Sequence, residues 1–221
     1  MDQPVPASGP RSALVAGATG LVGRAIVQGL LADDAVAAVH VLARRALALQ
    51  HPKLAVHLVD FAALPALPSV QEVYLALGTT IKVAGSQPAF RAVDFDANLA
   101  VATAARQAGA KRLGLVSAMG ADARSAIFYS RVKGELEEAL DRLQYEGLVV
   151  ARPSMLAGDR PALGQPERGG EKLALQVSRW LRPLIPGNYR SIQADDVARA
   201  LLRAVPAVRG KTVLLSGMMQ P

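Results

Sequence analysis

The sequence predicts one α/β domain, built as a doubly wound parallel sheet with helices on both faces and a small C-terminal cap. Its length of 221 residues suits a single domain with a large core. Hydrophobic residues make up 51% of the chain and aromatic residues only 4%, so Ala, Val and Leu supply most of the core. Such a core is typical of buried parallel strands covered by helices. Short apolar runs alternate with helical patterns along the chain, which indicates the same architecture.

The two ends of the chain are expected to differ in order. Residues 1–10 lack the basic start and apolar middle of a signal peptide and are expected to form a disordered leader. Residues 11–221 are expected to form the single domain. No apolar run approaches the ~18 uncharged residues needed to span a bilayer, so no membrane partner is predicted. The absence of cysteine excludes disulfides, cysteine-ligated zinc and thiol nucleophiles, and it is consistent with the cytoplasmic location that we predict.

The net charge of +7 raises the question of a nucleic-acid partner. The basic residues are scattered, however, and no basic run alternates with aromatic residues, so no nucleic-acid partner is predicted. A basic surface can also raise the local concentration of an anionic cofactor. The three histidines, His40, His51 and His57, have neither H-E-x-x-H spacing nor clustered carboxylates, so no metal site is predicted.

A strand, a glycine turn and a helix are predicted over residues 14–24, LVAGATGLVGR. In this G-x-x-G-x-x-G pattern, Gly17 lets the chain turn sharply and Gly20 lets backbone N–H groups approach a pyrophosphate. Gly23 lets the helix, whose positive N-terminus faces the ligand, lie close to its strand. The alternative is a strand-to-helix connection whose glycines serve packing alone. The residues predicted to bind the pyrophosphate are Gly17, Ala18, Thr19, Gly20, Leu21, Val22 and Gly23.

The end of the second predicted strand, Val36 to Leu42, indicates which dinucleotide is bound. An acidic residue about 20 residues past the glycines accepts hydrogen bonds from the ribose of NAD, whereas an arginine there accommodates the 2′-phosphate of NADP. This chain has Arg44 and Arg45 at that place and no acid. A guanidinium forms charge-assisted bonds with phosphate oxygens, so NADP(H) is predicted in preference to NAD(H). The alternative is that both arginines are ordinary surface residues.

Two further strand ends are predicted to contact the nucleotide. The third strand, Leu54 to Val59, ends at Asp60 and Phe61, where a side chain can meet the adenine. The fourth strand, Val73 to Leu77, runs into a loop at the ligand-binding edge of an open α/β sheet. The residues predicted to line the cofactor's ribose are Leu77, Gly78, Thr79 and Thr80. An ordinary strand-to-loop exit is the alternative for each threonine.

The second part of the chain carries a candidate catalytic set. A helix is predicted over 88–108, then a strand from Leu113 to Val116 with Ser117 at its end, then an amphipathic helix. Tyr129 and Lys133 are four residues apart on that helix and share one face. A phenol has an ordinary pKa of about 10, but a neighbouring ammonium favours the phenolate and so lowers that pKa. Ser117 could donate to a substrate carbonyl and hold it against the phenol.

These motifs, in this order, resemble the short-chain dehydrogenase/reductase superfamily, in its extended and atypical branch. The group of Tat-interactive-protein-like and NmrA-like NAD(P)-binding oxidoreductases is the most similar, over nearly the whole chain. The blocks that carry the resemblance are residues 77–80, LGTT, residues 93–94, VD, residues 116–122, VSAMGAD, and residues 129–135, YSRVKGE. The resemblance implies a Rossmann-like fold with pyrophosphate on the glycine turn and the 2′-phosphate at Arg44.

The resemblance also implies roles for individual residues. Ser117, Tyr129 and Lys133 would form the catalytic trio, with Lys133 also binding the nicotinamide ribose. Asp94 departs from the pattern, because it stands roughly where many extended members carry an asparagine that helps order a proton-relay water. After a sixth strand, Leu148 to Ala151, the family's corresponding segment passes the nicotinamide, which implicates Pro153 and Met155.

The C-terminal part is expected to close over the pocket. Residues 157–170 are rich in Gly, Pro and charge, which is typical of a loop, and a helix is predicted over 171–181. Together they suggest a substrate lid over about 157–190. A helix with Asp195 as its N-cap is predicted to run to about Val205, followed by a short strand, Lys211 to Leu215.

The sequence therefore predicts an NADP(H)-dependent oxidoreductase that transfers a hydride between the nicotinamide and a carbonyl or alcohol carbon of a small-molecule substrate. Two alternatives use the same cofactor. One is a regulatory protein that senses NADP(H) with little catalysis, although it would not need the Ser-Tyr-Lys set. The other is an epimerase or dehydratase, which usually needs a larger C-terminal region. The sequence does not name the substrate, and it leaves open whether the protein forms a homo-oligomer.

Overall fold

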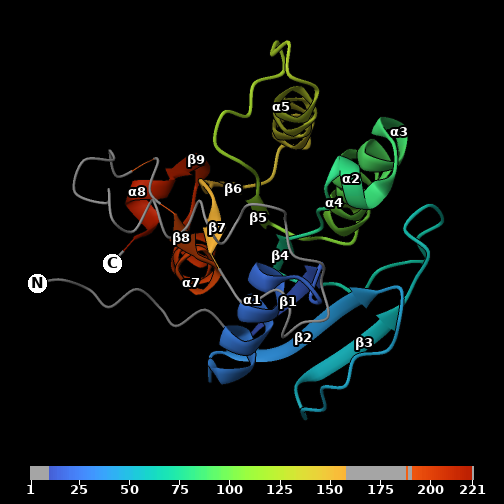
Figure 1. Ribbon diagram of the computed structural model, residues 1–221. Helices are drawn as coiled ribbons and strands as arrows, with labels where there is room; N and C mark the ends of the chain where they lie inside the picture. Colours follow the sequence, from blue (N-terminus) through green and yellow to red (C-terminus); the bar gives the residue numbers. More distant parts are fainter. Residues whose placement is uncertain (1–9, 158–187, 189–190, 221) are drawn as a thin grey trace, which may run out of the picture.

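Figure 1 shows the computed structural model, which describes residues 10–157, 188 and 191–220. Its centre is a seven-stranded sheet in the order β3-β2-β1-β4-β5-β6-β9, and every pairing in it is parallel. This is the doubly wound sheet that the sequence predicts. The strands are β1 (Arg11–Ala16), β2 (Val36–Ala43), β3 (Leu54–Leu58), β4 (Glu72–Leu75), β5 (Arg112–Val116), β6 (Gly147–Arg152) and β9 (Gly210–Leu215).

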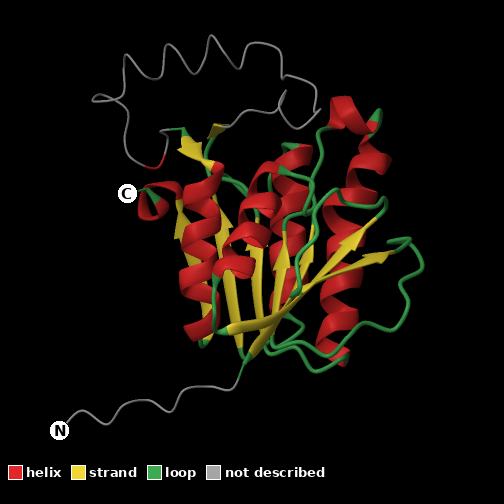
Figure 2. Ribbon diagram, turned by 90° about the horizontal axis from the view of Figure 1, so that it is seen from below, coloured by secondary structure: helices red, strands yellow, loops and turns green. Residues whose placement is uncertain are grey.

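Helices cover both faces of the sheet, because the strands are apolar on both sides and need cover on each. Helices α1 (Leu21–Ala32) and α7 (Ala194–Ala204) lie on one face, where Ile26 and Leu201 join the core. Helices α4 (Asn98–Gln107) and α5 (Phe128–Asp141) lie on the other, where Val101 and Leu136 are fully buried. Figure 2 shows the two helical layers with the sheet between them.

The order of the strands places the ligand-binding edge. From β1 the chain builds β2 and β3 on one side, then crosses back to β4 and continues through β5 and β6 on the other. The carboxyl ends of β1 and β4 therefore diverge at a switch point, where open α/β sheets form a crevice. The glycine turn after Ala16 and the loop after Leu75 meet at this point.

The helix predicted over 88–108 is divided into three segments. It begins as α3 (Gln87–Arg91), widens into the π-helix η1 (Ala92–Ala97) and continues as α4. A short helix, α2 (Ile81–Ala84), precedes α3 and ends at Gly85, whose φ is +86°. A π-helical turn holds one more residue than an α-helical turn, so it changes which side chains face inward. Asp94 lies in this segment and is buried.

The C-terminal part adds a small parallel sheet of β7 (Leu156–Ala157) and β8 (Ile192–Gln193), a 3₁₀-helix, η5 (Val205–Ala207), and a final helix, α8 (Ser216–Met219). The predicted N-cap of α7 is wrong. Gln193 occupies that position, and Asp195 lies in the first turn, where a carboxylate still interacts favourably with the helix dipole.

Some predictions fall on residues that the structure does not describe. They are the leader, apart from residue 10, most of the lid over 157–190, and the helix over 171–181. Within the described ranges, no helix combines the length and apolar character needed to cross a membrane.

The amino-terminal edge of the sheet carries a buried polar cluster. Arg11 donates to both carboxylate oxygens of Glu72, at 2.8 and 3.0 Å, and also pairs with Asp33. Tyr74 donates to Glu72 at 2.9 Å, and the side chains of Tyr74 and Glu72 are fully buried. Burial and the Glu72 charge raise the pKa of the Tyr74 phenol well above its ordinary value. The cluster joins β1 to β4 at the edge opposite the glycine turn.

Candidate active site

The glycine turn at the end of β1 has the geometry of an anion cradle. Gly17 has a φ of +97°, and a Cβ there would collide with the backbone of Ala76. A Cβ on Gly23 would collide with the Gly17 carbonyl, so both positions require glycine. Around Gly20, in contrast, the nearest atom to an added Cβ is the Gly17 oxygen at 3.4 Å. Gly20 is the N-cap of α1 and has no side chain to cap it, so the helix N-terminus stays available to an anion.

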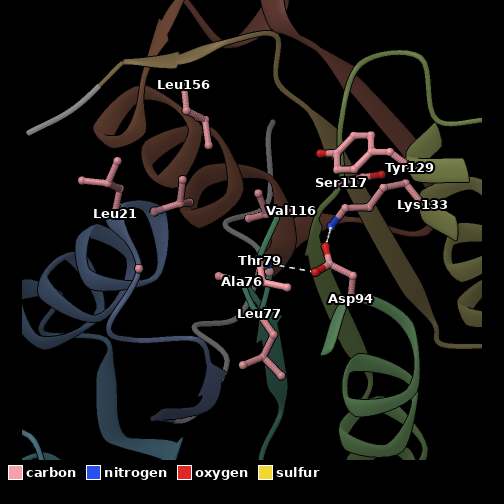
Figure 3. Close-up of a pocket in the computed structure, with 13 residues that line it drawn as sticks. Leu21, Ala76, Leu77, Thr79, Asp94, Val116, Ser117, Tyr129, Lys133 and Leu156 are labelled. Atoms are coloured by element: carbon pink, nitrogen blue, oxygen red, sulfur yellow. Dashed lines mark hydrogen bonds and ion pairs between the residues drawn. The ribbon is translucent and has the colours of Figure 1, made fainter. Parts of the chain in front are cut away.

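A pocket lies beside this turn, between the carboxyl ends of β1, β4 and β5 and the start of α5 (Figure 3). Most of its polar side chains come from the later part of the chain, from Asp94 onward, and most of its apolar side chains come from the earlier part, up to Leu77. It is lined by Gly20, Leu21, Val22, Ala76, Leu77, Gly78, Thr79, Asp94, Val116, Ser117, Tyr129, Lys133 and Leu156. The structure therefore brings the three candidate catalytic residues to the same cavity as the glycine turn.

Helix α5 presents Tyr129 and Lys133 to the pocket on successive turns (Figure 3). Its position is fixed by Gly134, where a Cβ would collide with the backbone of Asp122 and Ala123. The Tyr129 ring packs against Phe90 of α3, with 5.6 Å between ring centroids. Tyr129 keeps 37% of its surface exposed, whereas Lys133 keeps 4%, so the phenol can reach a ligand while the ammonium is buried.

Asp94 is the direct partner of Lys133. Its Oδ1 lies 2.7 Å from the Lys133 Nζ, and its Oδ2 accepts a hydrogen bond from the backbone N–H of Thr79 at 2.8 Å. Asn98 supports this turn by donating to the carbonyls of Leu77, Val93 and Asp94. A buried ammonium is costly unless it is paired, and Asp94 supplies that pair. The departure from asparagine thus places a charge where the resemblance implies a neutral amide.

Ser117 lies at the end of β5 with its side chain turned toward α5. Its hydroxyl donates to the carboxylate of Glu137, and Arg152 binds that carboxylate through Nη2 at 2.6 Å and through Nε at 3.1 and 3.2 Å. Glu137 is absent from the residues predicted for the site, and no role is predicted for Arg152. The available signal was spacing, because Glu137 lies four residues after Lys133 on the same helix.

The residues predicted for the adenine end lie outside the pocket. Arg44 and Arg45 are exposed directly after β2, whose Leu42 pairs with Ala16 at the end of β1. They are therefore neighbours of the glycine turn. Asp60 accepts a hydrogen bond from the N–H of Ala62 at 2.9 Å, and Phe61 lines a separate groove along α4.

Other predicted residues also lie outside the pocket lining. Ala18 and Thr19 belong to the glycine turn itself. Thr80 caps α2 by accepting from the Val83 N–H at 3.1 Å. Pro153 is buried and its carbonyl accepts from the Met119 N–H at 2.9 Å, while Met155 is exposed. Among the described residues, no three His, Cys, Asp or Glu side chains form a group that could hold a metal ion.

Comparison with known proteins identifies the family to which the chain belongs. Residues 17–207 match a family model described as NAD(P)H-binding. "Protein FMP52, mitochondrial" of Candida albicans is 30% identical over 200 residues, which cover 86% of both chains. "Protein fmp52-1, mitochondrial" of Aspergillus terreus is 36% identical over 227 residues, which cover 93% of this chain and 95% of the relative.

Solved structures share the fold. MoeE5 in complex with UDP-glucose and NAD superposes with a TM-score of 0.69 at 20% identity, covering 92% of this chain and 75% of MoeE5. A short chain dehydrogenase family protein from Francisella tularensis has a TM-score of 0.66 at 14% identity, covering 94% of this chain and 98% of that protein.

The relatives overturn one prediction. A cytoplasmic location is predicted from the sequence, but the curated relatives from Candida albicans and Aspergillus terreus are named mitochondrial proteins, so that prediction is wrong. The absence of cysteine, on which it partly rested, is a property of composition and does not specify a compartment.

The glycine turn, the parallel sheet, the matched family model and the extended similarity to relatives all lead to the same assignment. The chain belongs to the NAD(P)H-binding family, and its fold is that of the short-chain dehydrogenase/reductase superfamily.

Proposed function

We propose that the protein is an NADP(H)-dependent oxidoreductase that exchanges a hydride with a carbonyl or alcohol carbon of a small molecule. The observation that carries this proposal is that Tyr129, Lys133 and Ser117 line one pocket with the N-terminus of α1. An anion-binding turn and an acid–base set next to each other suit a nucleotide on one side and a reacting carbonyl on the other.

The residues present are suited to the nucleotide. The open Gly20 and the uncapped start of α1 can receive a pyrophosphate. Arg44 and Arg45, exposed beside the turn, can bind a 2′-phosphate, and this is the reason to favour NADP(H) over NAD(H). Lys133 can hold a ribose hydroxyl, because an ammonium has three donors and Asp94 occupies one of them.

In this proposal Tyr129 transfers the proton and Lys133, besides holding the ribose, supports it. Bound NADPH supplies the hydride. The Tyr129 phenol donates its proton to the carbonyl oxygen as the carbon is reduced, and it recovers a proton from solvent through its exposed side. The Lys133 ammonium lies one turn away and stabilises the phenolate that remains. Leu21, Val116 and Leu156 supply apolar walls that exclude water from the reacting carbon.

The test combines binding with turnover on the full chain. Calorimetric titration should show tighter binding of NADPH than of NADH, and Arg44→Ser should remove most of that difference. NADPH oxidation over a panel of aldehydes and ketones should then identify a turned-over compound. Tyr129→Phe should lower kcat by about 100-fold or more, since general acid catalysis contributes at least that much, while nucleotide affinity stays unchanged.

Tyr145→Phe is the matched control, because the Tyr145 hydroxyl donates to the Ala102 carbonyl away from the pocket. It should retain wild-type kcat. Full turnover in Tyr129→Phe would refute the role given to this phenol. Tight NADPH binding with no turnover on any compound would instead support the alternative, a protein that senses the nucleotide.

A further inference from the structure

The hydroxyl proton of Ser117 is already committed within the protein. Ser117 and Glu137 keep only 5% and 3% of their surfaces exposed, so water does not compete for their hydrogen bond. Arg152 donates three hydrogen bonds of 3.2 Å or less to the same carboxylate. This hydrogen bonding raises the pKa of the Arg152 guanidinium. A carboxylate held by a guanidinium can only accept hydrogen bonds, so Ser117 must be the donor.

This arrangement determines what Ser117 can offer a ligand. A serine hydroxyl has one proton and two lone pairs, and here the proton faces Glu137. The backbone N–H of Ser117 donates to the Ala151 carbonyl at 2.8 Å, which holds the residue in line with the sheet. Toward the pocket Ser117 therefore presents lone pairs. A carbonyl oxygen also has only lone pairs, so Ser117 is unsuited to hold the reacting oxygen, the role that the sequence predicts for it.

We propose that Ser117 is a hydrogen-bond acceptor in this pocket, kept in that role by Glu137 and Arg152, and that the substrates are carbonyl compounds with a hydroxyl on the neighbouring carbon. The proposal rests on the function proposed above. Tyr129 donates its proton to the carbonyl oxygen of the substrate, and the hydroxyl on the neighbouring carbon of the substrate donates a hydrogen bond to Ser117. Asp94 and Lys133, the two charged groups of the pocket, compensate each other.

The reaction balances with the proposed cofactor. An α-hydroxy ketone, NADPH and a proton give a vicinal diol and NADP⁺. The hydride forms the new C–H bond at the carbonyl carbon while the C=O π bond breaks. The Tyr129 proton goes to the oxygen, and Tyr129 is then reprotonated from solvent. The hydroxyl that binds Ser117 keeps its proton throughout, so Ser117 and Glu137 position the substrate and exchange no proton with it.

The first arm of the test needs neither nucleotide nor substrate. Neutron diffraction from crystals of the deuterated, nucleotide-free full chain locates the deuterium of Ser117. The proposal requires it between the Ser117 oxygen and Glu137. A deuterium that points into the pocket, or one that is bonded to a Glu137 oxygen, overturns the acceptor role.

The second arm compares two probes in which the hydroxyl hydrogen of one is replaced by a methyl group in the other. Hydroxyacetone and methoxyacetone both carry an oxygen beside the carbonyl, but only the first can donate to Ser117. We expect wild-type kcat/KM to favour hydroxyacetone by roughly 3- to 10-fold, the effect of one net hydrogen bond. Ser117→Ala should bring the ratio close to one, mainly through a higher KM for hydroxyacetone.

Glu137→Gln probes the positioning role separately. A glutamine amide can donate to Ser117 while its oxygen still accepts from Arg152, which frees the serine proton to face the pocket. The preference for hydroxyacetone should then fall. Glu138→Gln is the control, since this neighbouring carboxylate is exposed and 3.9 Å from Arg142, and its ratio should equal that of wild type.

The outcomes separate the two proposals. If the protein reduces both probes equally and Ser117→Ala lowers both rates alike, the acceptor role is wrong while the oxidoreductase function stands. If wild type reduces neither these probes nor any compound of the panel, the oxidoreductase function and the substrate class fail together, and the deuterium position still decides what Ser117 donates to. Should Glu137→Gln fail to fold, wild type and Ser117→Ala supply the deciding ratio.

Discussion

Asp94 shows how one residue changes the character of the site. Where the resemblance implies a neutral asparagine, this chain places a carboxylate 2.7 Å from the Lys133 ammonium, with both side chains almost fully buried. An ion pair of this kind holds the lysine in one position without a relay water between them. The cost is that each charge depends on the other, because an unpaired charge in the interior is strongly unfavourable.

Asp94→Asn should therefore lower the free energy of unfolding by about 3–5 kcal/mol, the usual effect of removing one partner of a buried pair. Urea unfolding of the nucleotide-free protein measures this. Asp96→Asn is the control, since Asp96 lies two residues away on the same π-helix but is exposed, and it should change stability by less than about 0.5 kcal/mol. A stable Asp94→Asn variant would mean that Lys133 can find another partner.

Helix α5 is the element on which the site depends, and Gly134 fixes its position. A Cβ at this residue would collide with backbone atoms of Asp122 and Ala123, which cannot move aside as a flexible side chain can. Any side chain at this position pushes the helix away from the loop. Tyr129 and Lys133 would move with it.

Gly134→Ala should destabilise the protein by about 1–3 kcal/mol, as overpacking usually does, although alanine is the better helix former. It should also weaken turnover of whichever compound the panel identifies. Gly29→Ala in α1 is the matched control, because the added methyl meets the end of the Leu202 side chain, which can rotate. Thermal unfolding of the two variants compares them directly, and equal losses would contradict the argument.

The edge strand β3 is held in part by a pair of imidazoles. His40 Nδ1 of β2 lies 3.0 Å from His57 Nε2 of β3, a hydrogen bond that requires at least one neutral ring. Burial, and then the charge of His57, lower the pKa of His40. Below the unfolded pKa of about 6.5 the unfolded chain binds more protons than the folded one, so stability falls as pH falls.

His40→Gln should therefore weaken the loss of thermal stability on the acid side of neutrality. Melting temperatures of wild type and variant, measured from about pH 8 down to about pH 5, give the comparison. His51→Gln serves as control, since His51 is exposed and lies outside the pair. If the melting temperature of His40→Gln falls as steeply with acid as that of wild type, groups other than this histidine pair cause the loss.

The sequence predicts the helices and strands well, but it predicts the contacts between them poorly. The glycine turn, the strand that ends at Ser117 and the Tyr129–Lys133 helix follow from local spacing, which short stretches of chain carry by themselves. The π-helix does not, because one extra residue in a turn leaves the apolar pattern of 88–108 readable as a plain helix. The Ser117–Glu137–Arg152 contacts join three separate elements, and only the folded sheet brings them together.

Across the whole molecule, the site and the main buried polar cluster occupy opposite edges of the sheet. The pocket lies at the carboxyl ends of the strands, while Arg11, Glu72 and Tyr74 join the amino ends of β1 and β4. Substitutions at Arg11, Glu72 or Tyr74 should therefore lower the stability of the fold and leave ligand binding intact.

Glu72→Gln tests this separation. The variant keeps the volume of the side chain but loses its charge, so we expect the free energy of unfolding to fall by about 2 kcal/mol. The dissociation constant for NADPH, measured by calorimetry below the unfolding transition, should match that of wild type. A change in NADPH affinity larger than about threefold would show that the two edges are coupled.

One helix carries Tyr129, Lys133 and Glu137 at intervals of four residues. Tyr129 lines the pocket, Lys133 pairs with the Asp94 carboxylate, and Glu137 accepts from the Ser117 hydroxyl. Their mutual spacing is thus inherited from the helical repeat and owes nothing to surrounding loops. Loops at the rim can lengthen, shorten or change composition while these three side chains keep their positions relative to one another.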